Sequence, residues 1–383
     1  MIDFDKIPTP CFLLDEQSLE INLQILNLVQ REANVKIICA LKGFAFWREF
    51  HNVGHYLSGA AASSLHEARL IAEEMSVEAH TYCPVYKKDE FENMLAYSSH
   101  LTFNSLNQYV QFYDKAKSFR KEVSLGLRIN PEYSEVKTDL YNPAMEGSRL
   151  GIMRSKLGDT LPEGIEGVHF HALCENDSYV LERTLAHVEQ KFGDLIRQAK
   201  WVNMGGGHLI TKEGYDVEHL VHLLKSFRKR YPNLQEIILE PGSAIGWQTG
   251  FLVASVQDII ECKDFNIAML DISFACHTPD CLEMPYKPVI LNAKEPQKGD
   301  KFIYRMGGNS CLAGDFMGMG DYAFNEPLEI GEKIVFEDMI HYTMVKTTFF
   351  NGVQHPHIAV WTKNDEFILL RSFDYEDYRG KLS

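Results

Sequence analysis

Eight short apolar runs, separated by longer segments with helical periodicity, constrain the fold more than any other feature of this sequence. Each run is hydrophobic throughout, which is typical of parallel strands that are buried on both faces. Eight strands that alternate with helices predict a closed (β/α)8 TIM-type barrel. The expected strands are Lys36–Leu41, Tyr56–Ala62, Ala79–Cys83, His100–Phe103, Val123–Ile129, Gly167–Ala172, Lys200–Met204 and Glu236–Leu239. Expected helices include Asp15–Arg31, Ser64–Glu74, Ser105–Phe119 and Val217–Arg230.

After Gly246 the strands follow one another without long helices between them, which predicts a second, all-β domain. Turns such as Asn351-Gly352 and Asn364-Asp365 favour antiparallel pairing in a β-sandwich or small β-barrel. The extended segment Thr9–Leu14 is a candidate to join that domain, so we expect a barrel at 15–245 and a β domain at 1–14 and 246–383. The expected strands are Phe251–Glu261, Ala268–Ile272, Lys301–Met306, Lys333–Phe336, Tyr342–Phe350, His357–Trp361 and Glu366–Phe373.

The net charge of −15 argues against nucleic acid and anionic membranes as partners and favours a cationic ligand, although an acidic excess also serves solubility. The acidic start of the sequence and the lack of an apolar run long enough to span a bilayer predict a cytoplasmic protein. None of the eight cysteines forms a CxxC pair, and the histidine pairs lack further ligands, so neither a disulfide framework nor a metal site is expected.

Barrel enzymes carry their chemistry at the carboxyl ends of the strands. Five expected strands end in polar or glycine-rich groups, which the barrel would bring to one face: Lys42, Arg128, His171, Gly205-Gly206-Gly207 and Glu240. Each has an ordinary alternative, such as a salt-bridge partner, a hydrogen-bonded histidine or a tight turn.

Together these groups are the parts that pyridoxal 5'-phosphate (PLP) needs. The amine of Lys42 can form a Schiff base with an aldehyde, and closely approached backbone N–H groups of glycines can bind a phosphate. A carboxylate such as Glu240 keeps a pyridine nitrogen protonated, and His171 offers a flat ring to stack on the cofactor. The set therefore indicates a PLP enzyme more specifically than any of its members.

The chain resembles the group III pyridoxal-phosphate decarboxylases, the alanine-racemase-like class that includes ornithine and diaminopimelate decarboxylases, and most closely those that act on carboxylated polyamines. The resemblance extends over nearly the whole chain. It is carried by Pro8–Phe12, Ala40–Lys42, Phe103–Ser105, Ser148–Gly151, Asn203–Gly207, Glu240–Ser243, Asp271–Ser273, His277 with Pro279-Asp280, Leu282–Tyr286, Ser310–Asp315 and Tyr342-Thr343.

The resemblance implies a role for each matching residue. Lys42 corresponds to the Schiff-base lysine, and Cys311 to the cysteine that protonates the substrate carbon after carbon dioxide leaves. It also implies a homodimer in which Cys311 and Asp315 reach the lysine of the other subunit. The implied cofactor contacts are Arg128 near the cofactor, His171 on its ring, Glu240 at its nitrogen, and Gly205, Gly206, Gly207 and Tyr342 at its phosphate. The chain has Ser243 where several relatives carry a phosphate-binding arginine, and Ala61 or Ala62 where relatives often have an aspartate.

A carboxylated polyamine carries ammonium groups that acids bind by charge-assisted hydrogen bonds. The expected substrate contacts are Asp271, His277, Asp280, Glu283 and Asp315. A diaminopimelate enzyme needs a cation for the second carboxylate, and Asp271–Pro288 and Ser310–Asp321 show no Arg/Lys-rich counterpart. The alternatives are a decarboxylase of diaminopimelate or ornithine, a racemase on the same fold, and a PLP-binding protein without catalytic activity.

Overall fold

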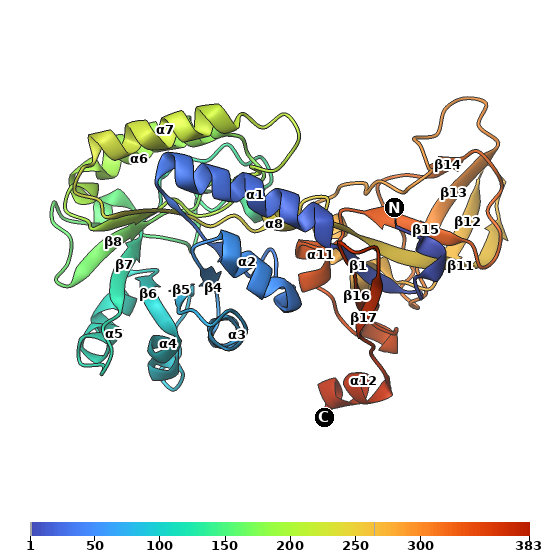
Figure 1. Cartoon of the computed structure of the whole chain (residues 1–383), viewed down its shortest axis with the longest axis horizontal. Helices are drawn as coiled ribbons and strands as arrows, with labels where there is room; N and C mark the ends of the chain where they lie inside the picture. Colours follow the sequence, from blue (N-terminus) through green and yellow to red (C-terminus); the bar gives the residue numbers. More distant parts are fainter. Residues whose placement is uncertain (1, 264) are drawn as a thin grey trace. The chain divides into compact units, whose positions relative to one another are not determined.

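The protein divides into two compact units in a computed structural model that describes residues 2–263 and 265–383 (Figure 1). One unit comprises Asn22–Ile245, and the other comprises the residues up to Ile21 together with Gly246–Ser383. The chain therefore enters the second unit, leaves it for the first, and returns to it after Ile245.

The first unit is the predicted parallel barrel. Every pair of neighbouring strands in its sheet is parallel, and most of their side chains are buried, as the continuous apolar runs predict. The strands are β2 (Lys36–Ile37), β3 (Cys39–Ala40), β4 (Ala60–Ala62), β5 (Ala79–Tyr82), β6 (Ser98–Phe103), β7 (Ser124–Arg128), β8 (Ile165–His169), β9 (Trp201–Asn203) and β10 (Glu236–Leu239).

The expected strand at Lys36–Leu41 is divided into two short strands, β2 and β3, which pair with opposite ends of the sheet. β2 pairs with β10, whereas β3 pairs with β4. Between them, the N–H of Ile38 donates to the carbonyl of Leu239, and the N–H of Cys39 donates to the carbonyl of Gly59. The stretch that contains β2 and β3 thus pairs with both β10, the last barrel strand, and β4, the next one, and so closes the barrel.

Helices follow the barrel strands, and several begin at the side chains that the sequence offers as caps. Ser64, Ser105, Asp177 and Asp216 each accept a hydrogen bond from a backbone N–H in the first turn of a helix. The helices are α1 (Glu16–Ala33), α2 (Phe50–Tyr56), α3 (Leu65–Leu70), α4 (Phe91–Tyr97), α5 (Leu106–Lys117), α6 (Ser178–Ile196), α7 (Val217–Arg230) and α8 (Ser243–Gly246). The expected strand at Tyr56–Ala62 is wrong in its first half, because Tyr56 is the last residue of α2.

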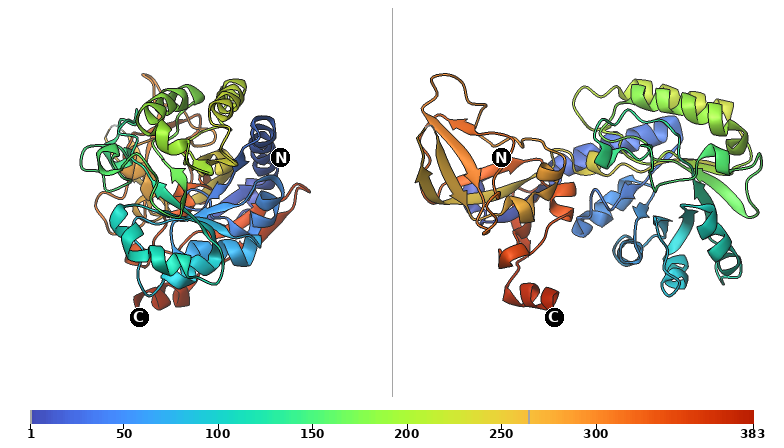
Figure 2. Two further views of the ribbon diagram at one scale, coloured as in Figure 1. Left: turned by 90° about the vertical axis from the view of Figure 1, so that its left-hand side faces the viewer. Right: turned by 180° about the vertical axis from the view of Figure 1, so that it is seen from behind.

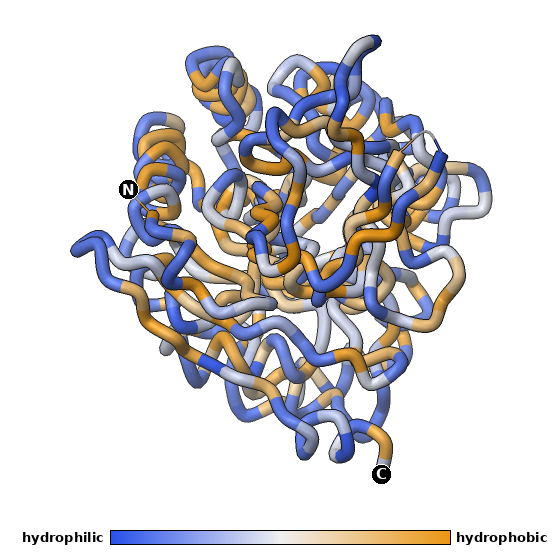
Figure 3. Tube along the Cα trace, turned by 90° about the vertical axis from the view of Figure 1, so that its right-hand side faces the viewer, coloured by the Kyte–Doolittle hydropathy of each residue, from blue (hydrophilic) through white to orange (hydrophobic). Residues whose placement is uncertain are grey.

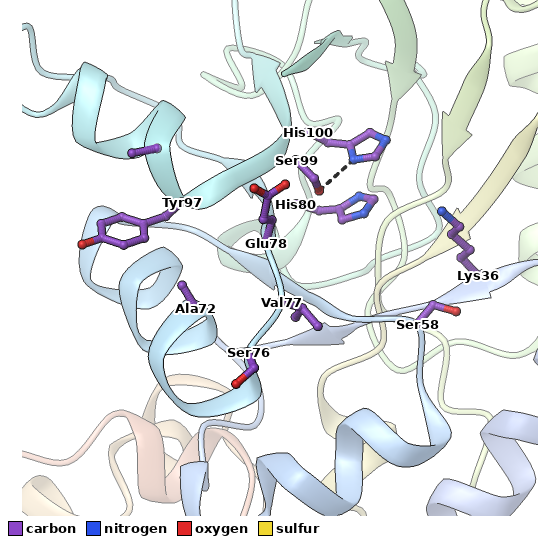
Figure 4. Close-up of a pocket in the computed structure, with 11 residues that line it drawn as sticks. Lys36, Ser58, Ala72, Ser76, Val77, Glu78, His80, Tyr97, Ser99 and His100 are labelled. Atoms are coloured by element: carbon purple, nitrogen blue, oxygen red, sulfur yellow. Dashed lines mark hydrogen bonds between the residues drawn. The ribbon is translucent and has the colours of Figure 1, made fainter. Parts of the chain in front are cut away.

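A recess of about 780 Å³ opens at the amino ends of the barrel strands (Figure 4). The rings of His80 and His100 stack there with their centroids 4.0 Å apart. Lys36 forms an ion pair of 2.5 Å with Glu236, whose other carboxylate oxygen lies 3.6 Å from Nε2 of His100. This end of the barrel therefore holds two closely packed imidazoles beside one ion pair.

The second unit is a mostly β structure around an eight-stranded sheet (Figure 2). The N-terminal segment contributes a strand to this sheet, because β1 lies between β11 and β16. Two pairings, β1–β16 and β12–β13, are parallel and so differ from the antiparallel pairing that the short turns indicate. The strands are β1 (Cys11–Asp15), β11 (Gly250–Glu261), β12 (Asn266–Leu270), β13 (Phe302–Gly307), β14 (Tyr322–Phe324), β15 (Lys333–Glu337), β16 (His357–Trp361) and β17 (Phe367–Arg371).

The expected strand at Tyr342–Phe350 is wrong. The short helix α11 (Tyr342–Val345) occupies its first part, and a 3-10 turn begins at Phe350. The hydroxyl of Thr343 donates to Asp280, and the N–H of Thr348 donates to the carbonyl of Cys276, so contacts distant in sequence hold this segment out of the sheet. The remaining helices are α9 (Phe274–His277), α10 (Pro279–Glu283) and α12 (Tyr375–Leu382).

Hydrophobic and hydrophilic segments are interspersed along the chain (Figure 3). Among the described residues, no helix has the length and apolar character needed to cross a membrane.

Candidate active site

Lys42 lies two residues beyond β3, at the carboxyl end of its barrel strand. Its side chain is exposed by area, yet enough protein surrounds it that desolvation is the main cause lowering its pKa. Arg128 lowers this pKa further, and Glu240 opposes the shift. A lowered pKa leaves more of the amine neutral at physiological pH, and the neutral amine is the nucleophile.

Lys42 is joined closely to the turn that follows Glu240. A Cβ atom on Gly43 would lie 2.8 Å from the Cα of Gly242, so only glycine permits the two backbones to approach this closely. Ser243 begins the short helix α8 immediately after this contact. The Lys42 turn and the Glu240–Ser243 turn are therefore packed as one structure.

Glu240 follows β10, and its carboxylate has one strong partner. The side-chain amide of Asn203, on β9, donates to Oε1 at 2.6 Å. Nε2 of the buried His169 lies 3.7 Å from Oε2. Burial raises the pKa of Glu240, while the hydrogen bond from Asn203 and the charges of Lys42 and Arg128 lower it. These partners favour the ionised carboxylate that a protonated pyridine nitrogen requires.

The glycine turn packs against both His171 and Glu240. Cβ atoms would lie 2.6 Å from the Cβ of His171 if placed on Gly205, and 2.3 Å from the carbonyl oxygen of Glu240 if placed on Gly206. Gly205 and Gly207 also have positive φ angles of 71° and 85°, which favour glycine. The turn therefore brings its backbone closer to its neighbours than other residues allow.

Two of the three glycine N–H groups already have partners. Gly205 donates to Oδ1 of Asn203, and Gly206 donates to Nδ1 of His171, both at 2.9 Å. The second bond places the proton of a neutral His171 on Nε2. The sequence predicts that all three glycine N–H groups bind a phosphate. Those of Gly205 and Gly206 are bonded to Asn203 and His171, so the N–H of Gly207 is the remaining candidate.

Arg128, at the end of β7, is only 4% exposed. Its guanidinium lies 4.5 Å from the centre of the Tyr82 ring and donates to the carbonyl of His171 at 3.4 Å. Burial lowers the pKa of Arg128, and Tyr82 and Glu240 oppose this shift. Arg128 therefore fixes the His171 backbone and contributes positive charge beside Lys42 and Glu240.

Glu67 is a residue of this site that the sequence analysis does not single out. Burial raises its pKa, whereas a hydrogen bond of 2.6 Å from the N–H of Ser63 and the charge of Lys42 lower it. It supplies a carboxylate near Lys42 just after β4, where Ala61–Ala62 lack one. The spacing Ser64-x-x-Glu67 at a helix start was the available signal, since the hydroxyl of Ser64 caps the N–H of Glu67.

These observations allow a test of the fit to PLP. The barrel brings Lys42, Arg128, His171, Glu240 and the glycine turn to one end of its sheet, with a carboxylate that accepts a hydrogen bond from Asn203 and a turn that a Cβ would block. The amine, the acid and the flat imidazole fit the cofactor. Among the described residues, no group of three or more metal-ligating side chains is present.

In the second unit, Cys311 is exposed on a loop that hydrogen bonds hold in place. Its N–H donates to Oδ1 of Asn351 at 2.7 Å. Asp315 is 3% exposed; its Oδ2 accepts from the N–H and hydroxyl of Ser310, and its Oδ1 accepts from the N–H of Ala275. Both oxygens of Asp315 thus accept hydrogen bonds within this unit, and those from Ser310 help to shape the Cys311 loop.

Asp280 and Asp271 differ in how many of their carboxylate oxygens already accept hydrogen bonds. Asp280 is 6% exposed; its Oδ2 accepts from Tyr286 and Thr343, whereas its buried Oδ1 has no hydrogen-bond partner within the described ranges. Asp271 uses both oxygens on Ser255.

His277, Glu283 and Tyr342 all have neighbours within their own unit. His277 is fully buried, its Nδ1 accepts from Ser273, and burial lowers its pKa to about 3. Glu283 forms an ion pair with Lys346, and Tyr342 is half-buried at the start of α11. Asp280 therefore has the clearest spare acceptor among the five.

Known proteins are similar to this chain across both of its units. The family model described as "Pyridoxal-dependent decarboxylase, C-terminal sheet domain" matches residues 83–340. A carboxyaminopropylagmatine decarboxylase of Synechocystis sp. is 51% identical over 98% of this chain and 96% of its own length. A carboxynorspermidine/carboxyspermidine decarboxylase of Campylobacter jejuni is 46% identical over 98% of both chains.

Solved structures show the same similarity. The crystal structure of carboxynorspermidine decarboxylase from Campylobacter jejuni, complexed with norspermidine, superposes with a TM-score of 0.90 at 44% identity. It covers 98% of this chain and 100% of that one. A diaminopimelate decarboxylase from Helicobacter pylori, complexed with L-lysine, gives a TM-score of 0.79 at 19% identity and covers 99% of this chain and 98% of its own, which shows a shared fold alone.

Proposed function

Because this chain belongs to the pyridoxal-dependent decarboxylases, we propose that its substrate is a carboxylated polyamine, with carboxynorspermidine and carboxyspermidine as the first candidates. The family resemblance seen in the sequence is confirmed, as are PLP as cofactor and decarboxylation in polyamine biosynthesis as the activity. The observation that carries the proposal is the meeting of Lys42, Arg128 and Glu240 beside the glycine turn, in a chain so similar to polyamine-forming decarboxylases.

In the proposed site, the amine of Lys42 would hold the cofactor, and the carboxylate of Glu240 would favour a protonated pyridine nitrogen. His171 would offer its flat ring to the cofactor, and Gly207, Ser243 and Tyr342 are the candidates to bind the phosphate. When bound, PLP supplies the electron sink that allows a carboxylate to leave as carbon dioxide. The barrel unit thus provides the cofactor chemistry, and the β unit provides substrate and dimer contacts.

We propose that Cys311 delivers the proton that replaces the lost carboxylate, and that it does so in the active site of a second subunit. The exposure of Cys311 supports this role, because a proton donor must be able to reach the substrate. The fixed loop around it, held by Asp315 and Asn351, limits the positions that its thiol can take. Sedimentation that finds a fully active monomer would contradict the shared site.

Asp280 is the proposed partner of a substrate ammonium group. Its Oδ1 is buried and has no hydrogen-bond partner in the described part of the chain, and such an oxygen is costly unless a ligand satisfies it. A primary or secondary ammonium can satisfy one oxygen with a single charge-assisted hydrogen bond. The single free oxygen of Asp280 therefore favours a substrate that presents an ammonium group at this position.

Carboxyaminopropylagmatine is a second candidate substrate, favoured by the 51% identity to the Synechocystis enzyme. It ends in a guanidinium, which binds best to two carboxylate oxygens at once. Oδ2 of Asp280 already accepts from Tyr286 and Thr343, so bidentate binding there would displace these bonds. The geometry of Asp280 thus favours a substrate that presents an ammonium group, whereas the sequence identity favours one that presents a guanidinium.

Diaminopimelate fits less well, because its second carboxylate needs a cation. Lys287 is the one lysine or arginine within Asp271–Pro288, and Ser310–Asp321 contains none. Lys287 forms an ion pair of 2.8 Å with Glu295 and donates to the carbonyl of Asp321 at 2.6 Å. It is therefore already committed within its own unit.

Carbon dioxide release from the PLP-loaded enzyme would test these assignments. Carboxynorspermidine, carboxyspermidine, carboxyaminopropylagmatine, diaminopimelate and ornithine would be compared by kcat/KM, and the configuration of unreacted substrate would reveal racemisation. We expect a carboxylated polyamine to be preferred by at least tenfold. Preference for diaminopimelate or ornithine would refute the polyamine assignment, and preference for the agmatine derivative would refute the role given to Asp280.

We further propose a cytoplasmic location and no nucleic-acid partner. All eight cysteines are unpaired, which fits a reducing compartment. The net charge of −15 opposes binding to a phosphate backbone.

A further inference from the structure

Asn203 connects two parts of the site that bind opposite ends of the cofactor in the proposed function. Its Nδ2 donates to Oε1 of Glu240 at 2.6 Å, and its Oδ1 accepts from the N–H of Gly205 at 2.9 Å. The side chain is 4% exposed. Both functional ends of the amide are therefore used, one on the acid and one on the glycine turn.

The backbone holds the same two parts together. The N–H of Glu240 donates to the carbonyl of Gly205 at 2.8 Å, and the Gly206 backbone approaches the Glu240 carbonyl so closely that a Cβ would lie 2.3 Å from it. The amide of Asn203 adds a hydrogen bond that reaches the carboxylate itself. Movement of the turn is thus linked to movement of the Glu240 carboxylate.

Because the side chain of Asn203 is uncharged and donates an N–H, it also affects the protonation of Glu240. Burial favours the protonated form of Glu240, and the hydrogen bond from Asn203 is the largest influence opposing it. The neighbouring His169 has no hydrogen bond to either ring nitrogen within the described residues, and its Nε2 lies 3.7 Å from Oε2. Asn203 is therefore the nearest donor that Glu240 has.

We propose that Asn203 is a positioning residue that keeps Glu240 ionised and aligned with the glycine turn, so that the sites for the pyridine nitrogen and the phosphate form one rigid unit. This inference rests on the proposed placement of the cofactor. It assigns Asn203 a role in binding PLP and in the pH dependence of that binding, beyond the packing of the barrel interior.

The test uses two substitutions of different character. Asn203→Asp preserves shape and keeps an oxygen for Gly205, but it places a second carboxyl beside Glu240. Two adjacent carboxyls share a proton at low pH and repel each other once both ionise. Asn203→Leu removes both hydrogen bonds at every pH. PLP affinity would be measured by absorbance titration of the apoenzyme from pH 6 to pH 9, and thermal melting of the apoenzyme would report folding.

We expect Asn203→Asp to bind PLP nearly as well as the parent at pH 6 and roughly 10- to 100-fold more weakly at pH 9, the size of effect expected for a hydrogen bond to a charged group. Asn203→Leu should lose a similar factor at all pH values. Asn233→Ala is the matched control, because its amide also makes two hydrogen bonds, to the carbonyls of Ile196 and Ala199. It should follow the parent throughout.

Wild-type affinity in both Asn203 variants would overturn the inference, as would losses in Asn203→Asp that do not change with pH. Should Asn203→Leu fail to fold, Asn203→Asp in a Glu240→Gln background decides the question, since removing one carboxyl should abolish the pH-dependent difference. Persistence of that difference would also overturn the inference. If the parent binds PLP but does not decarboxylate polyamines, the substrate proposal fails while this inference stands.

Discussion

Asp315→Asn would show whether Asp315 binds substrate or shapes the Cys311 loop. The native carboxylate accepts three hydrogen bonds, from the N–H and hydroxyl of Ser310 and the N–H of Ala275. An amide retains one oxygen and turns an NH₂ group toward at least one of these donors. One bond to a charged acceptor is lost and one buried donor is left unpaired, which costs about 2–4 kcal/mol in the free energy of unfolding.

In a unit of this size, such a loss lowers the melting temperature by roughly 5–15 °C. We expect kcat to fall at least tenfold while KM changes little, because a displaced loop misplaces the Cys311 thiol without removing a substrate contact. Calorimetry and steady-state carbon dioxide release would measure the two effects. Asp258→Asn is the control, since Asp258 is exposed and its side chain accepts a hydrogen bond from the N–H of the adjacent Ile259.

A variant Asp315→Asn with unchanged melting temperature and unchanged kcat, but a strongly raised KM, would refute this reasoning. That result would mean that the carboxylate faces the substrate amine, as the family resemblance implies, and that its hydrogen bonds to Ser310 and Ala275 contribute little to the fold.

Three further predictions concern the barrel. Lys42→Ala should abolish decarboxylation and the absorbance of covalently bound PLP while the apoenzyme melts as before; decarboxylation at the parental rate would contradict the attachment of cofactor there. Gly206→Ala should weaken PLP binding at least tenfold in an absorbance titration, because its Cβ would lie 2.3 Å from the carbonyl oxygen of Glu240, and unchanged binding would contradict this close approach. Burial lowers the pKa values of His80 and His100, so protons bind the unfolded chain more strongly. Stability should therefore be complete above about pH 6.5 and fall below it, by up to about 1.4 kcal/mol per pH unit for each histidine. Urea unfolding at pH 8 and pH 5 would measure this loss, which should shrink in His80→Phe.

The barrel was predictable because its strands depend on local hydrophobicity. Glu236–Leu239 and Val217–Arg230 have the same bounds in the structure as in the sequence analysis. The segment Tyr342–Phe350 is rich in β-branched and aromatic residues and was predicted as a strand, yet Thr343 and Thr348 bond to residues about 60 to 70 positions earlier. Strand propensity describes only the local preference of the residues. Contacts with residues distant in sequence can override it, and the local sequence does not indicate them.

The candidate site was predictable where it depends on strand ends and not where it depends on pairs of side chains. Lys42, Arg128 and Glu240 each lie at or just beyond the end of a strand, and a barrel necessarily brings such residues to one face. Asn203 and Glu240 are separated by 37 positions, and the motif Asn203–Gly207 does not indicate that the side chain of Asn203 bonds to Glu240. Glu67 was missed for a related reason, because its spacing from Ser64 indicates only a helix start.

Counting acids in a sequence overestimates the capacity of a protein to bind a cationic ligand, because hydrogen bonds accepted within the fold occupy part of the acceptor capacity of each carboxylate. Both oxygens of Asp271 and of Asp315 accept hydrogen bonds from neighbouring donors, whereas Oδ1 of Asp280 is buried and has no hydrogen-bond partner among the described residues. That oxygen has lost its hydration and gained nothing from the protein, so an ammonium group that reaches it recovers a charge-assisted hydrogen bond at little additional desolvation. Selectivity among polyamines would then depend on how far each places an ammonium group from its reacting carbon, rather than on the total negative charge of the protein.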